Sequence, residues 1–507
     1  MQKMRARILQ MGNPAAIEER RKKGQGSARS RIDYLLDKGS FTEMGLWVKP
    51  RATMFGMDKK EVPAEAVVTG FGTINGRPVA LASADYTAMG GSGGEYHALK
   101  YIRIIDFARE QGMPLVNLVD SGGLRFQEGM DAMQTYGAIF RALGLASGVV
   151  PQIAVLLGPC LGGQGYMPVM QDFLIQAKTT GYLAIAGPAV IKDSVFEDIG
   201  LEELAGWKPQ AIRAGNTHIV AEDEKDAIDR AKELLAFFPS NNREKPPRLA
   251  SSDDPDRPAP ELDTILPERL DRPWDMYRCI EKIVDNGHFV EIMKHFARNV
   301  IVGFARFSGR PVGIVASQPM VLGGALDVDS SDKSARFIRF CDLFNIPLVS
   351  LLDCPAMAIG SEQEWRGILR HGTKVLFAWA NATVPLISVN IRKQNGGGYH
   401  CMLHRGMGAD FSFAWPTATF FGTGSGPAAA IIYAREIREA PNPDELREQR
   451  MKDFEAYWGN PYRAGERGYV DDIIAPRDTR SMINRALDAL ANKTVNRTWK
   501  KYDNITL

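Results

Sequence analysis

The chain has 507 residues, about three times the size of a typical domain, so its length favours two large domains or three smaller ones. With 45% hydrophobic and 24% charged residues, the composition is that of an ordinary globular protein, which excludes disorder and coiled coil for most of the length. The 62 basic and 60 acidic residues give a formal net charge of +2. This balance provides no overall attraction to nucleic acid or to a membrane surface, although local basic sites remain possible.

Residues 1–26 are rich in Arg and Lys and lack the apolar core of a secretory signal. No stretch approaches the roughly 18 consecutive apolar residues that a membrane span needs. The cysteines form no CxxC pair, which argues against a disulfide framework and a zinc cage; they are Cys160, Cys279, Cys341, Cys354 and Cys401. We therefore expect a cytoplasmic protein, with the mitochondrial matrix as the second choice.

Short apolar runs alternate with segments of helical spacing along the chain. Residues 115–119, apart from Asn117, and residues 153–157 are apolar runs bounded by Pro or Gly, as strands buried on both faces are. Residues 101–111 and 335–344 have the apolar spacing of helices. Strands that alternate with helices predict α/β layering with largely parallel sheets.

Residues 239–273 hold eight of the 29 prolines of the chain. Such a segment cannot form an interior helix or a central strand, because proline lacks the backbone N–H that both require. We therefore predict a Pro-rich linker over residues 241–274, between an N-terminal domain of residues 1–240 and a C-terminal domain of residues 275–507.

The two halves are copies of one plan. The tetrapeptide Gly-Arg-Pro-Val at 76–79 recurs at 309–312, an offset of 233 residues, and the same offset carries residues 113–120 onto a matching segment. Later the offset slips by one residue and places 162–163 on 396–397. Chance would not hold one register across so many anchors, so we infer an internal duplication.

Glycines cluster directly after a buried strand at residues 155–165 and 389–399. A strand that runs into glycines and then a helix leaves backbone N–H groups unpaired, and these can bind an oxyanion. Glycine lets such donors approach a substrate without a Cβ in the way. The alternative is a tight turn without chemistry, which the equivalent position of the two turns makes less convincing. Neither turn has the GxxxxGK[ST] or GxGxxG spacing of a nucleotide-binding loop.

Three potential metal ligands, His400, Cys401 and His404, follow the second glycine turn. No further acidic or cysteine pair accompanies them. We therefore favour histidines that line a pocket or pack in the interior, and expect no metal in this chain.

Several long segments carry a family pattern: GQGSARSRIDYLLDKGSFTE from residue 24, DSGGLRFQEG from 120, GPCLGG from 158, DSSDKSARFIRFCDLFNIPLV from 329 and GYVDDIIAPRDT from 468. Through them the sequence resembles the carboxyltransferase (β) subunit of biotin-dependent acyl-CoA carboxylases, nearest the propionyl-CoA carboxylase branch. The resemblance implies an α/β fold built as a tandem duplication of a crotonase-like (ClpP/crotonase) ββα spiral. It also implies a hexamer in which two subunits build each active site, and separate biotin carboxylase and biotin carrier partners, since the chain shows no ATP-grasp-sized region and no Met-Lys-Met biotin acceptor.

The family pattern further implies that an acyl-CoA substrate sits on the first half and carboxybiotin, carried by the partner, on the second. Gly162 and Gly163 would then hold the thioester oxygen as it becomes an enolate, and Gly397 and Gly398 the ureido oxygen of biotin. The ureido nitrogen can itself remove the α-proton, so the protein needs only backbone donors and no base of its own.

Other family positions carry weaker expectations. Gly122 and Gly123, in the Ser-Gly-Gly turn, are expected to shape the CoA side of the cleft, with close packing as an equally good explanation. Arg29 and Arg31 lie in the early motif and are candidates for binding the CoA phosphates, although solvated charge is the commoner fate of such residues.

The sequence departs from the family pattern where substrates are chosen. The family's YGGAYD appears as NGGGYH, which keeps Tyr399 and puts His400 in place of Asp. DVPGFLPG appears as DCPAMAIG, which includes Met357, and LGGAxxH as LAGWKPQ, which includes Trp207. We hypothesise that the acyl pocket accepts something other than a plain two- or three-carbon group.

Two alternatives to a carboxylase subunit stay open. The carboxyltransferase subunit of a sodium-pumping acyl-CoA decarboxylase shares these motifs, and only that reading brings a membrane partner. A catalytically degenerate assembly subunit is the other, and the intact glycine turns argue against it.

Overall fold

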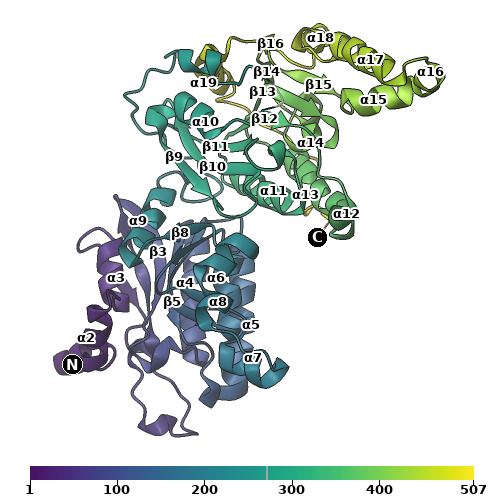
Figure 1. Cartoon of the computed structure of the whole chain (residues 1–507). Helices are drawn as coiled ribbons and strands as arrows, with labels where there is room; N and C mark the ends of the chain where they lie inside the picture. The colour runs from purple at the N-terminus through teal and green to yellow at the C-terminus, as the bar shows by residue number, and fades with distance from the viewer. Residues whose placement is uncertain (270–271, 507) are drawn as a thin grey trace. The chain divides into compact units, whose positions relative to one another are not determined.

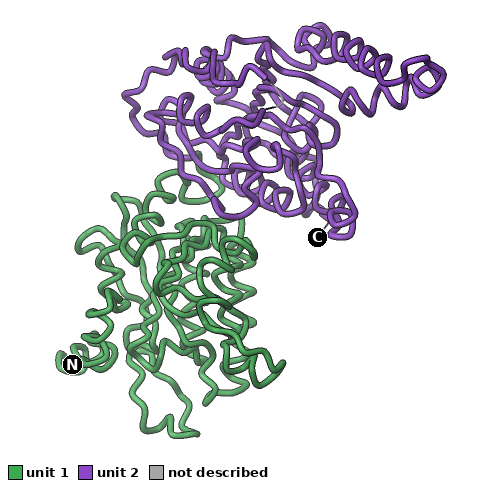
Figure 2. The backbone as a smooth tube through the Cα atoms, in the orientation of Figure 1, with its two compact units in different colours: residues 1–245 green, residues 246–507 purple. Residues whose placement is uncertain are grey.

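The computed structural model describes residues 1–269 and 272–506. The chain forms two compact units, Met1–Lys245 and Pro246–Leu507, drawn in green and purple in Figure 2. Within the described residues, each unit holds its own eight-stranded sheet.

The sheet of the first unit has the strand order β1-β2-β3-β4-β5-β6-β8, and the short β7 pairs with the end of β5. Strands β1 to β3 pair antiparallel, whereas β3, β4, β5, β6 and β8 pair in parallel. The strands are β1 Thr42–Met44, β2 Val67–Ile74, β3 Arg77–Ala84, β4 Leu115–Ser121, β5 Gln152–Leu161, β6 Phe173–Ala177, β7 Tyr182–Ala184 and β8 Ile219–Ala221. The helices (Figure 1) are α1 Gln2–Gln10, α2 Pro14–Lys22, α3 Ala28–Leu35, α4 Glu95–Gln111, α5 Gly129–Ala146, α6 Tyr166–Met170, α7 Pro188–Val195, α8 Leu201–Ala205 and α9 Glu224–Leu235.

The sheet of the second unit has the order β16-β14-β13-β12-β11-β10-β9, and the short β15 pairs with the end of β13. Its strands are β9 Phe289–Ile292, β10 Val300–Phe307, β11 Arg310–Ser317, β12 Leu348–Cys354, β13 Leu386–Asn395, β14 Phe411–Ala414, β15 Thr419–Phe421 and β16 Asp472–Ile473. Its helices are α10 Tyr277–Ile283, α11 Val328–Leu343, α12 Ser361–Trp365, α13 Ile368–Asn381, α14 Gly396–Cys401, α15 Ser425–Ile432, α16 Ala434–Glu439, α17 Pro443–Trp458, α18 Pro461–Glu466 and α19 Thr479–Ala489. No helix among the described residues combines the length and the apolarity that a bilayer crossing requires.

The two sheets repeat one another along the chain, which confirms the predicted duplication. Strand β2 begins at Val67 and β10 at Val300, an offset of 233, and β5 begins at Gln152 and β13 at Leu386, an offset of 234. The slip of one residue lies between these strands, where the single helix α5 of the first unit corresponds to the pair α12 and α13 of the second.

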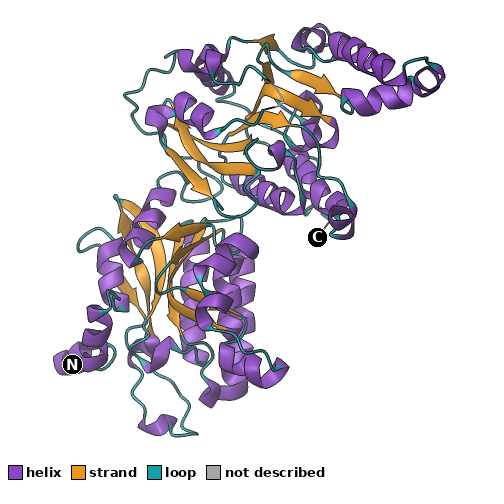
Figure 3. Cartoon of the chain, viewed as in Figure 1, coloured by secondary structure: helices purple, strands orange, loops and turns teal. Residues whose placement is uncertain are grey.

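The central parallel strands form the core of each unit. All seven residues of β4 and of β12 are buried, because helices cover the sheets, as Figure 3 shows. The strands predicted at 115–119 and 153–157 lie inside β4 and β5, and the helix predicted at 101–111 ends with α4 at Gln111. Helix α11 contains all but the last residue of the helix predicted at 335–344.

The Pro-rich segment is, from Pro246 onward, a folded part of the second unit. Ala259, Leu262, Ile265 and Trp274 are buried in the hydrophobic core of that unit. Proline is tolerated here because the segment forms irregular chain and one 3₁₀ turn, whose first position does not need a backbone N–H. The structure therefore differs from the expectation of a separate linker over 241–274, of which residues 270 and 271 lie outside the described residues.

Candidate active site

The first glycine turn, Gly162–Gly165, joins the end of β5 to α6. Gly162 has a φ of 74°, a left-handed conformation that side chains disfavour. A Cβ built on Gly162 or on Gly163 would meet no atom within 4 Å, so the space in front of both residues is open. The first N–H groups of such a turn have no acceptor within the turn, and they can stabilise negative charge on a substrate oxygen.

The second glycine turn begins α14, directly after β13. Gly397 is exposed, as Gly163 is at the equivalent position of the first unit. A Cβ on Gly397 would lie 3.2 Å from Cγ of Met357, so Met357, a predicted site residue, lies against this turn. Gly398 is buried, and a Cβ there would lie 2.5 Å from Sγ of Cys354. Close packing is therefore one reason for glycine at position 398.

Each glycine turn lies beside a buried aspartate at the end of the neighbouring strand. Asp120 of β4 accepts hydrogen bonds from Arg31 (2.7 Å) and from Arg20. The equivalent Asp353 of β12 accepts from Arg392 (2.8 Å) and from the indole N–H of Trp274 (2.6 Å). Asp353 also accepts from a backbone N–H of β13, next to the second turn. These buried carboxylates and their donors hold the strand ends that present the glycines.

The two arginines proposed to bind the CoA phosphates form ion pairs with carboxylates of the first unit. Arg31 is 2% exposed, and Asp120 and Glu224 both neutralise its charge. Arg29 forms a bidentate ion pair with Glu43, at 2.8 and 3.0 Å. A buried arginine whose donors already meet carboxylates cannot also bind a phosphate, so the prediction for Arg31 is corrected, and the pairing of Arg29 argues against it as well.

The Ser-Gly-Gly turn after β4 packs against the first glycine turn. The N–H of Gly122 donates to the carbonyl oxygen of Gly90 (2.8 Å), and that of Gly123 donates to Oγ of Ser121 (3.2 Å). A Cβ on Gly123 would lie 2.8 Å from the carbonyl oxygen of Leu161, the residue before Gly162. Because its N–H groups are used internally, this turn supports the end of β5, which favours the close-packing explanation.

Within the first unit the structure brings together the ends of β4 and β5, with both glycine pairs. Trp207 lies in the chain after α8, where the amino groups of Lys178 and Lys208 lie 5.4 and 5.9 Å from its ring centroid. The second unit brings together Met357, Gly397, Tyr399 and His400.

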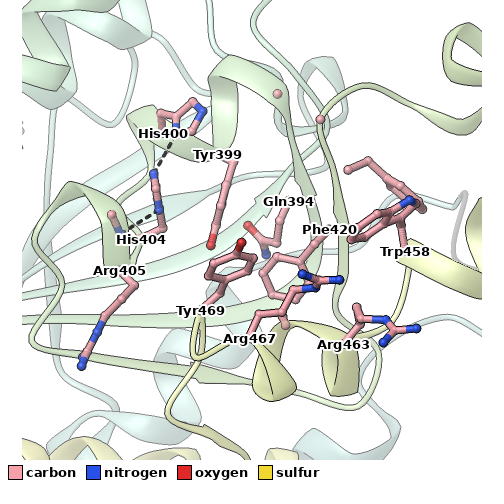
Figure 4. A pocket seen from close by; sticks show the side chains of 15 residues that line it. Gln394, Tyr399, His400, His404, Arg405, Phe420, Trp458, Arg463, Arg467 and Tyr469 are labelled. Atoms are coloured by element: carbon pink, nitrogen blue, oxygen red, sulfur yellow. Dashed lines mark hydrogen bonds between the residues drawn. The ribbon is translucent and has the colours of Figure 1, made fainter.

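A cavity of about 460 Å³ opens beside α14 in the second unit (Figure 4). Tyr399 and His400, both predicted, contribute to its wall. The other lining side chains come from β13, β15, α17, α18 and the loops near them; they include Gln394, His404, Arg405, Phe420, Trp458, Arg463, Arg467 and Tyr469. His404 was expected to line a pocket or to pack in the interior. Sequence reasoning missed the other seven as site residues, because they are spread over 76 positions of the chain and share no spacing signal.

Gln394, at the end of β13, is one of the residues that line this cavity. Gln394 is fully buried and its amide nitrogen donates to the carbonyl oxygen of Leu352 (3.0 Å). Its Oε1 is buried and has no hydrogen-bond partner among the described residues. The aromatic side chains of the wall suit a small ligand with an apolar ring.

The two histidines of the cavity bond to each other. Nδ1 of His400 lies 2.7 Å from Nε2 of His404, and the ring of His404 stacks on Tyr399 with centroids 4.3 Å apart. Burial, followed by the neighbouring His400, lowers the pKa of His404 to about 4. Burial raises the pKa of Tyr399, with a further contribution from Tyr469. Among the described residues no group of three or more His, Cys, Asp or Glu side chains is placed to hold a metal ion.

Comparison with known proteins places this geometry in a family. Residues 19–505 match the model of the carboxyl transferase domain. The propionyl-CoA carboxylase beta chain of Roseobacter denitrificans is 44% identical over 496 residues, which cover 98% of this chain and 96% of that protein. The methylmalonyl-CoA decarboxylase subunit alpha of Propionigenium modestum is 42% identical over 507 residues, which cover 100% of this chain and 98% of that protein.

A solved structure agrees with the fold of the whole chain. Transcarboxylase 12S, with methylmalonyl-coenzyme A and methylmalonic acid bound, matches with a TM-score of 0.97 and 44% sequence identity, over 99% of this chain and 96% of that one. The two duplicated α/β units thus have the crotonase-like fold that the resemblance implied. The chain belongs to the carboxyl transferase family.

Proposed function

We propose that the chain is the carboxyltransferase subunit of a biotin-dependent complex, which moves a carboxyl group from carboxybiotin on a separate carrier subunit to the α-carbon of a short or modified, propionyl-CoA-like acyl-CoA. The observation that carries this proposal is the pair of equivalent turns, in which Gly163 and Gly397 are both exposed at the start of a helical turn. Two reactants that both develop negative charge on oxygen need two such sets of donors.

In this function the first turn holds the acyl-CoA. The N–H groups of Gly162 and Gly163 would stabilise the thioester oxygen when the α-proton leaves and an enolate forms, because donors aimed at developing charge favour the transition state over the bound substrate. The open space in front of these glycines admits the thioester to the backbone.

The second turn would hold the biotin group. When bound, carboxybiotin supplies the carboxyl group and, through its ureido nitrogen, the base. Gly397 and Gly398 would donate to the ureido oxygen, and the cavity beside α14 has aromatic walls that suit a small heterocycle.

Incubation of the purified chain with methylmalonyl-CoA and free biotin tests this function. We expect biotin-dependent formation of propionyl-CoA, and no product when biotin is left out. Absence of biotin-dependent turnover would contradict the proposal and favour the degenerate assembly subunit.

The direction of transfer depends on the partners. Relatives of similar identity are propionyl-CoA carboxylase beta chains and methylmalonyl-CoA decarboxylase alpha subunits, so a subunit of a decarboxylase is the second candidate. Recovery of an ATP-using biotin carboxylase with the native protein would support the carboxylase, and recovery of a membrane subunit would support the decarboxylase.

We also propose that the chain assembles as a hexamer in the cytoplasm. The structure of transcarboxylase 12S is described as a hexamer assembly, and an active site shared between subunits would bring a first unit against a second unit of another chain. The mitochondrial matrix stays the second choice for location, as for the mitochondrial propionyl-CoA carboxylase beta chain of Sus scrofa.

His400 is proposed to alter the choice of acyl group. An imidazole can donate a hydrogen bond where the ionised carboxylate of the family pattern can only accept. Rates on acetyl-, propionyl- and bulkier or polar acyl-CoAs, for the wild type and for His400→Asp, test this. We expect His400→Asp to shift the preference toward propionyl-CoA, and a propionyl-CoA preference that the substitution leaves unchanged would contradict the hypothesis.

A further inference from the structure

A chain of hydrogen bonds fixes where the protons of the two cavity histidines lie. The backbone N–H of Gly406 donates to Nδ1 of His404 (3.1 Å). A neutral imidazole has one donor nitrogen and one acceptor nitrogen, so His404 carries its proton on Nε2. This Nε2–H donates to Nδ1 of His400 (2.7 Å), and His400 must therefore carry its own proton on Nε2.

Packing holds His404 in this role. Its ring stacks on Tyr399 at an interplanar angle of 23°, and Figure 4 shows the hydrogen bond between His404 and His400 as a dashed line. Burial lowers the pKa of His404 to about 4, so the ring is neutral and keeps the same tautomer at neutral pH. His400 itself is exposed at the edge of the cavity and leaves its Nε2–H available.

Three arginines, each with a contact inside the protein, also line the cavity. Arg405 pairs with Asp471 at 3.2 Å, and Arg463 pairs with Glu466 at 2.8 Å. Arg467 lies over the ring of Trp458, 5.1 Å from its centroid. Of the two nitrogens of His400, the one left to meet a ligand is a donor, so its partner must be an acceptor.

We infer that His404 is a positioning residue that holds His400 as an N–H donor, and that His400 donates to a carboxylate or carbonyl oxygen of a reactant at the second glycine turn. This inference rests on the proposed function. The oxygen can belong to the carboxybiotin or to the carboxylated acyl-CoA, and kinetics can separate the two sources.

The experiment measures biotin-dependent decarboxylation of methylmalonyl-CoA by the full chain, with the KM for free biotin and the KM for methylmalonyl-CoA determined separately. His404→Phe keeps a ring against Tyr399 and removes the donor. We expect it to raise one of the two KM values roughly threefold to tenfold, the range for loss of one hydrogen bond, with kcat within about twofold. The KM that rises identifies the reactant that His400 contacts.

His404→Gln is the matched control, because its amide N–H can reach the position of Nε2; we expect a KM close to that of the wild type. His404→Asn keeps an acceptor for the Gly406 N–H but is too short to reach His400, so it tests the same point if the Phe variant does not fold. We expect it to behave like His404→Phe.

A double-mutant cycle with His400→Phe shows whether His404 acts through His400. We expect His404→Phe to cause no further change in KM when His400 is already Phe. Unchanged KM values in both His404→Phe and His404→Asn would overturn this inference but not the proposed function. The same holds if His404→Phe changes KM as much in the His400→Phe background as in the wild type. A wild type without biotin-dependent turnover would instead overturn the proposed function, and this inference with it.

Discussion

Substitution of Gly163 by Val separates an effect on catalysis from an effect on folding. A Cβ at this position meets no atom within 4 Å, and Gly163 is not among the glycines with positive φ. The folding free energy should therefore change by no more than about 0.5 kcal/mol, as for other surface positions. In the proposed function the thioester oxygen approaches the backbone through this same open space, so the valine side chain would hold the substrate away from its donors.

The expected loss in kcat is about 10²-fold or more, which corresponds to about 2.7 kcal/mol of transition-state stabilisation. Biotin-dependent decarboxylation of methylmalonyl-CoA measures it, together with thermal unfolding of the same sample. Gly144→Val is the control, because Gly144 is exposed on α5 and a Cβ there also meets no atom within 4 Å. Unchanged kcat in Gly163→Val, or an equal loss in the control, would refute the assignment of the first turn.

Three further changes test the internal packing. Arg31→Met leaves two buried carboxylates without their partner and should lower the free energy of unfolding by about 3–5 kcal/mol in urea denaturation; a loss below about 1 kcal/mol would contradict it. Gly398→Val places a Cβ 2.9 Å from the backbone of the adjoining loop, and thermal unfolding should show a loss of about 1–3 kcal/mol from overpacking. Lys333 donates to backbone carbonyls of residues 293–300, and burial lowers its pKa to about 8. In the unfolded state the pKa of this lysine is about 10.5, so between about pH 8 and pH 10.5 the unfolded state binds more protons than the folded state. The free energy of unfolding of the wild type should therefore rise with pH over this range, by at most about 1.4 kcal/mol per pH unit from this group. Urea denaturation across this range should show that Lys333→Met lacks this contribution, and an identical pH dependence of the two proteins would contradict it.

The repeat and the glycine turns could be predicted because their signals are local or periodic. The offset of 233 residues follows from matching short motifs in the two halves of the sequence. A buried strand followed by Gly162 or Gly396 is a pattern within one short segment. The structure keeps both signals, since β5 and β13 end directly before these glycines. Met357 was found through a family motif, and the structure places it against Gly397.

The Pro-rich segment shows that local sequence composition does not predict whether an irregular segment is buried. Its prolines correctly exclude regular helix and strand, yet exclusion of regular structure does not decide whether a segment is free or packed. Leu262, Ile265 and Trp274 supply apolar side chains that the second unit buries, and burial of such area stabilises an irregular segment as it does a helix.

What the sequence by itself determined is the duplicated α/β plan and the two glycine turns, because each depends on residues close together or on one repeated spacing. Only the tertiary structure decided which charged side chains pair with one another inside the protein and which residues surround the second glycine turn. Arg31 meets Glu224 across 193 positions of the chain, and no spacing rule connects two such residues. The proton positions on His400 and His404 likewise depend on a single backbone N–H, that of Gly406, whose direction is fixed only when the chain is folded.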